Sequence, residues 1–167
     1  MNLEPHVLQS IVDESIGEAV DRLTLKGINL KIKYPHDPVI VTVDKEKLKL
    51  AFSNILVNAT EAIDHDHGKI AVMIETIEDN HAIIISDNGC GITEENISRL
   101  FEPYFTSKRN GMGLGLASTL NIIQSNKGSI DVKSEVNVGT SFIITFKKGE
   151  NIIAPGLKPG AMISPRL

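Results

Sequence analysis

The sequence contains little cysteine, no excess of positive charge and no long hydrophobic run. Cys90 is the only cysteine in 167 residues, so no disulfide can form within the chain, and a reducing, cytoplasmic location is expected. The net charge of −4 argues against a nucleic-acid partner, because proteins that bind a phosphate backbone usually carry a basic surface. No apolar run reaches the length of a membrane span, and no signal-peptide pattern opens the sequence.

With 41% hydrophobic and 23% charged residues, the chain has the composition of one globular domain. Apolar periodicity and turn residues predict helices over 6–26, 44–63 and 114–123, a short helix capped by Thr93, and strands over 28–33, 39–43, 69–76, 81–86, 129–133 and 140–147. Paired strands separated by helices predict a two-layer α/β sandwich, with a mixed sheet and helices packed on one face. The predicted domain spans 1–148, and the proline- and glycine-rich residues 149–167 are expected to form a flexible or extended tail.

A polar, glycine-containing segment, Asp87-Asn88-Gly89-Cys90-Gly91-Ile92, follows the apolar run 82–86 directly. The run is typical of a buried strand, so Asp87 is predicted to lie at a strand end. Glycine lets the backbone turn sharply or lets a flat ligand approach closely. Taken alone, the segment is better explained as a turn than as a functional site. No activating base lies near Cys90 in sequence, so Cys90 is expected to be a small buried residue.

The predicted helix 44–63 carries polar residues on a face of its own. Asn54, Asn58 and Glu61 are three and four residues apart and therefore share this face. Asparagine is a poor helix former, and such a conflict with local propensity often marks a functional position. From this helix alone, a functional face and a solvated face are equally plausible.

A second glycine cluster, Gly111-Met112-Gly113-Leu114-Gly115-Leu116, leads into the helix predicted over 114–123. Exposed N–H groups and the helix dipole make such a junction suitable for phosphate, and Lys108 and Arg109 could add positive charge. The spacing matches neither the Rossmann nor the Walker pattern. A lone cluster of this kind is weak evidence, since glycines also simply end helices and strands.

Taken together and in order, these segments resemble the conserved boxes of sensor histidine kinases. The N, G1, F and G2 boxes are matched by residues 54–59, 87–92, 101–105 and 111–116, and Gly139-Thr140-Ser141-Phe142 closes the match. The resemblance covers roughly residues 40–146. It implies the ATP-binding catalytic domain of two-component histidine kinases, with the left-handed α/β fold of the GHKL (Bergerat) superfamily.

The resemblance also implies roles for individual residues. Asp87 would accept the adenine amino hydrogen, and Asn58 would bind Mg²⁺ through its side-chain oxygen. Asn54 would reach the phosphates or a metal-bound water, and Lys108 or Arg109 would clamp the γ-phosphate from a mobile lid over 102–112. Asn54 and Lys108 are the residues expected to act in catalysis. The full nucleotide-binding set implied is Asn54, Asn58, Asp87, Gly89, Gly91, Ile92, Lys108, Arg109, Gly111, Gly113, Leu114, Gly115 and Thr140.

Position 54 favours phosphoryl transfer over hydrolysis. ATP-hydrolysing relatives such as DNA gyrase place a glutamate base one helical turn before the metal-binding asparagine, whereas this sequence has Asn54 there. An amide cannot deprotonate a water molecule. Glu61 lies on the same helix face and is the alternative base.

The histidine-bearing helical hairpin of such kinases does not appear in the sequence, and none of its five histidines resembles the phosphoacceptor. The chain therefore resembles a catalytic domain cut from a larger dimeric kinase. It is expected to bind MgATP or MgADP as a monomer, to serve a histidine on a separate dimerisation domain and, indirectly, a response regulator, and not to phosphorylate itself. A stand-alone serine kinase of the anti-sigma-factor type and a non-enzymatic docking module are the alternatives.

Overall fold

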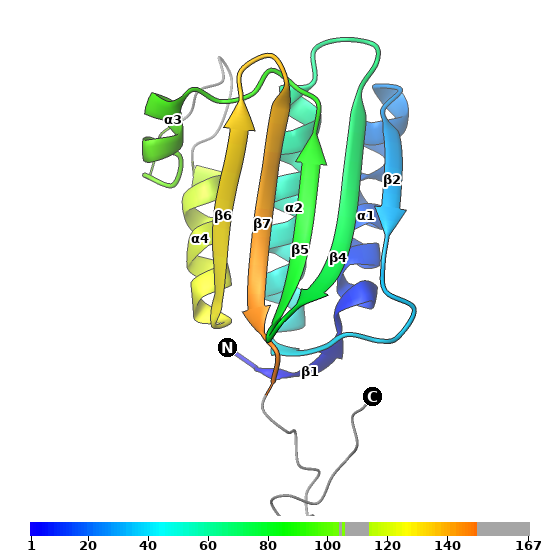
Figure 1. The fold of residues 1–167 in the computed structure, drawn as a ribbon, viewed down its shortest axis with the longest axis vertical. Helices are drawn as coiled ribbons and strands as arrows, with labels where there is room; N and C mark the ends of the chain where they lie inside the picture. The colour runs from blue at the N-terminus through cyan, green and yellow to red at the C-terminus, as the bar shows by residue number, and fades with distance from the viewer. Residues whose placement is uncertain (104, 106–113, 150–167) are drawn as a thin grey trace, which may run out of the picture.

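A five-stranded sheet with helices on one face forms the body of the protein (Figure 1). The computed structural model describes residues 1–103, 105 and 114–149. The strand order is β2 (Asn29–Lys33), β4 (Lys69–Ile77), β5 (Asn80–Asp87), β7 (Gly139–Lys147) and β6 (Gly128–Glu135). β2 pairs with β4 in parallel and the other pairs are antiparallel, so the predicted mixed sheet is confirmed.

Three long helices cover one face of the sheet (Figure 1). They are α1 (Leu8–Leu25), α2 (Lys45–Ala62) and α4 (Leu114–Ser125), and the short α3 (Glu94–Arg99) lies beside one end of the sheet. The predicted two-layer α/β sandwich is therefore confirmed. None of the helices in the described part of the chain is long and apolar enough to cross a membrane.

The N-terminal segment differs from the prediction. Residues 6 and 7 were predicted to begin a helix, but β1 (Glu4–Val7) pairs antiparallel with β3 (Ile40–Val43), and α1 begins only at Leu8. The Leu8 N–H donates to Val39 O at 2.7 Å and so continues the contact between the two segments. A partner strand more than thirty residues away leaves no trace in the local periodicity, so sequence reading extended the helix too far.

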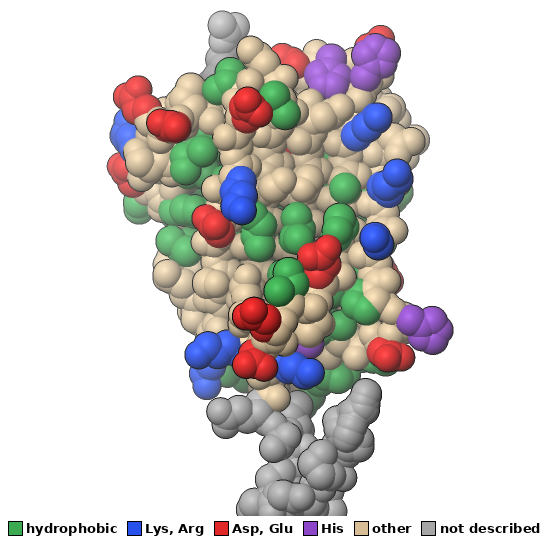
Figure 2. All heavy atoms as spheres, viewed as in Figure 1, with side chains coloured by type: hydrophobic (Ala, Val, Ile, Leu, Met, Phe, Trp, Pro, Cys, Tyr) green, Lys and Arg blue, Asp and Glu red, His purple; other side chains and the backbone are tan. Residues whose placement is uncertain are grey.

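The core lies between the helices and the sheet. Alternate residues of β4 are buried, at Ile70, Val72 and Ile74, because successive side chains of a strand point to opposite faces. They pack in one cluster with fully buried α2 residues such as Phe52 and Ile55. The other sheet face, shown in Figure 2, carries half-buried hydrophobic side chains over the central strands and lysines along one edge.

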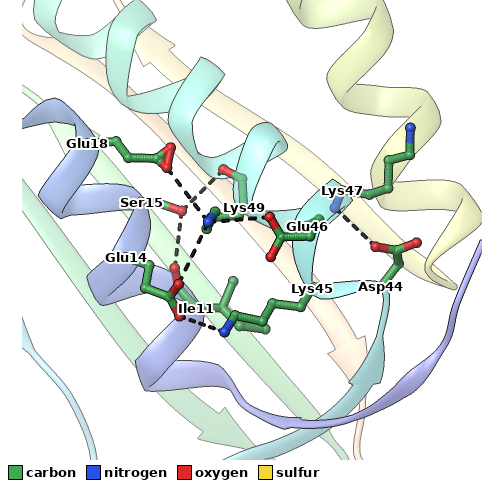
Figure 3. Close-up of polar contacts among 9 residues, drawn as sticks. All are labelled: Ile11, Glu14, Ser15, Glu18, Asp44, Lys45, Glu46, Lys47 and Lys49. Atoms are coloured by element: carbon green, nitrogen blue, oxygen red, sulfur yellow. Dashed lines mark hydrogen bonds and ion pairs between the residues drawn. The ribbon is translucent and has the colours of Figure 1, made fainter.

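An ion-pair cluster joins the middle of α1 to the start of α2 (Figure 3). Lys49 Nζ lies 3.7 Å from Glu14, 4.0 Å from Glu18 and 3.5 Å from Glu46. Lys45 Nζ lies 2.9 Å from Glu14, and the hydrogen bond from this lysine lowers the pKa of the Glu14 carboxyl. Exposed pairs of this kind contribute little individually, and α1 and α2 also share buried residues in one core cluster.

Candidate nucleotide site

A cavity of about 610 Å³ opens between α2, the end of β5, α3 and the start of α4. This volume is within the usual range for small-molecule sites, about 300–1,000 Å³. Five residues of α2 line it, namely Asn54, Val57, Asn58, Glu61 and Ala62. The segment after β5 contributes a second group that begins with Asp87.

Asp87 is the last residue of β5, a strand in the interior of the sheet. In register it pairs with Ile70 and Thr140, so its side chain points to the helix-covered face. It is half-buried, and its Oδ1 accepts the Gly89 N–H at 2.8 Å. The sheet therefore places this carboxylate in the cavity wall and the following turn fixes its direction.

The loop after Asp87 is anchored on two sides. Cys90 N donates to Ala62 O at 2.9 Å at the end of α2, and Asn137 N in the β6–β7 turn donates to Cys90 O at 2.8 Å. Gly91 has φ +76°, and a Cβ there would meet the carbonyl oxygen of Glu135. The glycine at 91 is thus required by the protein's own backbone.

Two expectations for this loop need qualification. Cys90 was expected to be buried, but it is exposed and lines the cavity, because both its backbone groups are held by neighbouring segments while its side chain points outward. Gly89 is buried and is not among the described residues that line the cavity. A Cβ on Gly89 would lie 2.6 Å from the Ala62 carbonyl carbon, so Gly89 allows α2 to approach the loop.

The two helical asparagines are held by hydrogen bonds from their side-chain nitrogens. Asn58 Nδ2 donates to Asn54 O at 2.9 Å. Asn54 Nδ2 donates to Thr119 Oγ1 at 3.3 Å and lies 3.5 Å from Gly115 O on α4. Both asparagines line the cavity.

The remaining predicted site residues fall into three groups. Ile92, Gly115 and Thr140 line the cavity, and Thr140 is buried with its hydroxyl 2.7 Å from Ser134 Oγ. Leu114 is the first residue of α4. The residues outside the described part of the chain are Lys108, Arg109, Gly111 and Gly113, as is most of the predicted lid.

Sequence reading missed several lining residues. Arg22 of α1 is the only basic side chain among the described residues that line the cavity. It lies in the last turn of an ordinary amphipathic helix, and nothing in the local pattern distinguishes it. Thr93, Asn96, Leu100 and Phe105 form the wall on the α3 side, and Arg99 stacks over the Phe105 ring with its guanidinium carbon 4.7 Å from the ring centre.

Residues 43–150 match the family described as histidine kinase-, DNA gyrase B-, and HSP90-like ATPase. The chain belongs to this family. The match spans all four predicted boxes, and the relatives reported next are sensor kinases or catalytic domains of histidine kinases.

Relatives of this ATPase domain include sporulation kinase A of Bacillus subtilis, 34% identical over 141 residues that make up 84% of this chain and 23% of the relative. The sensor kinase AtoS of Escherichia coli is 41% identical over 105 residues, 62% of this chain and 17% of the relative. The solved catalytic domain of histidine kinase ThkA superposes with a TM-score of 0.80 at 26% identity, covering 89% of this chain and 97% of that one. The chain spans about a fifth to a third of the first curated relatives.

The cavity of the ATPase domain fits a magnesium-bound nucleotide in size and in chemistry. Asp87 offers a carboxylate that could accept a hydrogen bond from a nucleotide base. The N-terminus of α4 supplies the positive end of a helix dipole for phosphate. Within the described residues, no three His, Cys, Asp or Glu side chains cluster so as to hold a metal. Mg²⁺ commonly takes few protein ligands and binds mainly through substrate phosphates, which suits a site with an asparagine oxygen.

Proposed function

We propose that this chain is the catalytic part of a sensor histidine kinase, which transfers the γ-phosphate of ATP to a histidine on a separate dimerisation and phosphoacceptor domain. A response regulator would then take the phosphate from that histidine. The observation that carries the proposal is that Asp87 and the pair Asn54 and Asn58 line one cavity at the start of α4. The sensor kinases among the relatives support it. The proposal also holds that the domain is cytoplasmic, that it is a monomer on its own, and that the full kinase is a homodimer.

Each residue contributes a simple interaction. Asp87 accepts a hydrogen from the adenine amino group, and Asn58 offers its side-chain oxygen to Mg²⁺. Asn54 faces the phosphates or a metal-bound water, and the α4 N-terminus with Gly115 receives the phosphate chain. Mg²⁺ neutralises phosphate charge when it is bound. Lys108 or Arg109 is proposed to contact the γ-phosphate.

Transfer is favoured over hydrolysis because the asparagine at position 54 cannot act as a base. Glu61 is the one carboxylate on the same helix face of α2 that lines the cavity. ATP turnover by this chain alone, lost in Glu61→Gln, would show that the domain is a hydrolase. Absence of turnover in both proteins is expected. Phosphorylation of a serine on a partner protein would instead support the anti-sigma-factor type of kinase.

Thermal unfolding with and without MgADP tests the nucleotide site. At about a hundred times its dissociation constant, a ligand stabilises the fold by roughly 2.7 kcal/mol, which raises the melting temperature of a domain of this size by about 5–10 °C. The shift should be lost in Asp87→Asn, because this change replaces one carboxylate oxygen, a hydrogen-bond acceptor, by an NH₂ group, a donor. It should persist in Asp131→Asn, which makes the same change at an exposed position of β6. Failure of the unmodified chain to shift would favour the docking module.

A further inference from the structure

One fully buried hydroxyl of α4 contacts the cavity asparagine of α2. Thr119 is 0% exposed, and its Oγ1 donates to Gly115 O at 2.6 Å, one turn earlier in the same helix. The same oxygen lies 3.3 Å from Asn54 Nδ2. This contact joins two helices that are far apart in sequence but pack side by side.

The position of the hydroxyl proton determines how the Asn54 amide is oriented. Gly115 O can only accept, so it takes the single Thr119 proton. Thr119 Oγ1 can then act only as an acceptor toward Asn54, and Gly115 O at 3.5 Å is a second acceptor on the same side. The nitrogen of the amide must therefore face α4, and its oxygen faces away from α4.

We propose that Thr119 is a positioning residue, which holds the Asn54 amide so that its oxygen is presented to the phosphate side of the nucleotide. The inference rests on the proposed nucleotide site and adds a residue that no box of the family resemblance contains. Without the hydroxyl, the long contact to Gly115 O is the one contact from the described residues that still distinguishes the two ends of the amide. Thr119 touches no ligand itself in this arrangement and acts through Asn54.

The test compares two ligands that share the adenine but differ in phosphate. Binding of MgADP is measured by isothermal titration calorimetry and binding of adenosine by NMR titration, for the whole chain and for Thr119→Val. One hydrogen bond is worth a factor of about three to ten, so Thr119→Val should weaken MgADP by that factor and leave adenosine unchanged. Thr119→Ser keeps the hydroxyl and should restore MgADP binding. Thr119→Ala repeats the deletion with a different packing defect, in case the valine variant does not fold.

A matched control and a double-variant cycle separate positioning from general destabilisation. Thr60→Val removes another buried helical hydroxyl, which donates to Leu56 O at 2.8 Å, and should leave the preference for MgADP over adenosine unchanged. In an Asn54→Ala background, Thr119→Val should have no further effect, because the two residues act as one unit. An unmodified chain that does not bind MgADP overturns both proposals. If it does bind, equal weakening of both ligands, or none in either deletion variant, overturns the role of Thr119 alone.

Discussion

Single polar residues at the cavity are oriented by hydrogen bonds to their neighbours. The asparagines at 54 and 58 are unfavourable in a helix by propensity, yet each donates its side-chain N–H to an oxygen on α2 or α4. Asp87 is held in the same way by the Gly89 N–H. Local propensity therefore opposes asparagine at 54 and 58, which both line the cavity, and hydrogen bonds with named partners offset the cost.

Two glycines of the cavity should respond in opposite directions to alanine. Gly91→Ala places a Cβ on a left-handed backbone and against the Glu135 carbonyl, and should destabilise the fold by about 2 kcal/mol or more. Gly115 is helical, and a Cβ there meets nothing within 4 Å, so Gly115→Ala should stabilise by up to about 1 kcal/mol. Urea unfolding followed by circular dichroism measures both.

Gly115→Ala also separates an effect on fold stability from an effect on ligand binding. If the phosphates pass close to the start of α4, the added methyl of Gly115→Ala should weaken MgADP binding in a protein that is more stable. Unchanged MgADP affinity in Gly115→Ala would place the phosphates elsewhere.

At the scale of elements, α2 connects the rest of the site. Its N-cap Asp44 accepts the backbone N–H of Asn2 at 3.0 Å and of Lys47 at 3.2 Å. At its other end, Lys26 Nζ donates to the Thr60 and Ile63 carbonyls at 2.8 Å each, while Ala62 O accepts from the loop that follows Asp87. The helix that carries the two asparagines is therefore fixed at both ends.

The Asp44 cap of α2 predicts that the fold loses stability in acid. Hydrogen bonds from Asn2 and then Lys47 hold the pKa of Asp44 below its usual range. A lowered pKa in the folded state adds stability above the unfolded value, about 3.9, and this stability is lost as the pH falls through the folded value. The native chain should thus have a higher urea midpoint than Asp44→Asn at pH 7, and the difference should shrink below about pH 4. A difference of the same size at pH 3 would contradict the role of the charge, since the other carboxylates are common to both proteins.

Elements with a strong local pattern could be predicted from sequence, and contacts between distant segments could not. Periodicity and the Asp44 cap located α2, and alternation located β2. The pairing of β1 with β3 and the exposure of Cys90 depend on partners distant in sequence, as does the contact of Thr119 with Asn54. The ordered boxes identified the cavity residues on α2 and after β5, whereas Arg22 reaches the cavity only through the packing of α1 on α2.

At the scale of the whole molecule, the cavity and the N-terminal strand β1 lie at opposite ends of the sheet. Asp87 ends β5 at one end, while β1 and the last residues of β7 lie at the other (Figure 1). The buried hydrophobic residues of the described chain extend from Leu8 to Phe146. Folding and nucleotide binding should therefore depend on residues up to the end of β7.

Truncation after Gly149 tests this arrangement and the predicted domain limit. Changes outside the core usually alter stability by about 0.5 kcal/mol or less, so the shortened chain should melt within about 2 °C of the full chain and keep its MgADP shift. Truncation after Ile143 removes Ile144 and Phe146, 0% and 4% exposed, and should abolish cooperative unfolding. If the first truncation alone lost the MgADP shift while still folding, residues 150–167 would belong to the nucleotide site despite following the strand end opposite the cavity. If it lost cooperative unfolding as well, those residues would belong to the core of the domain.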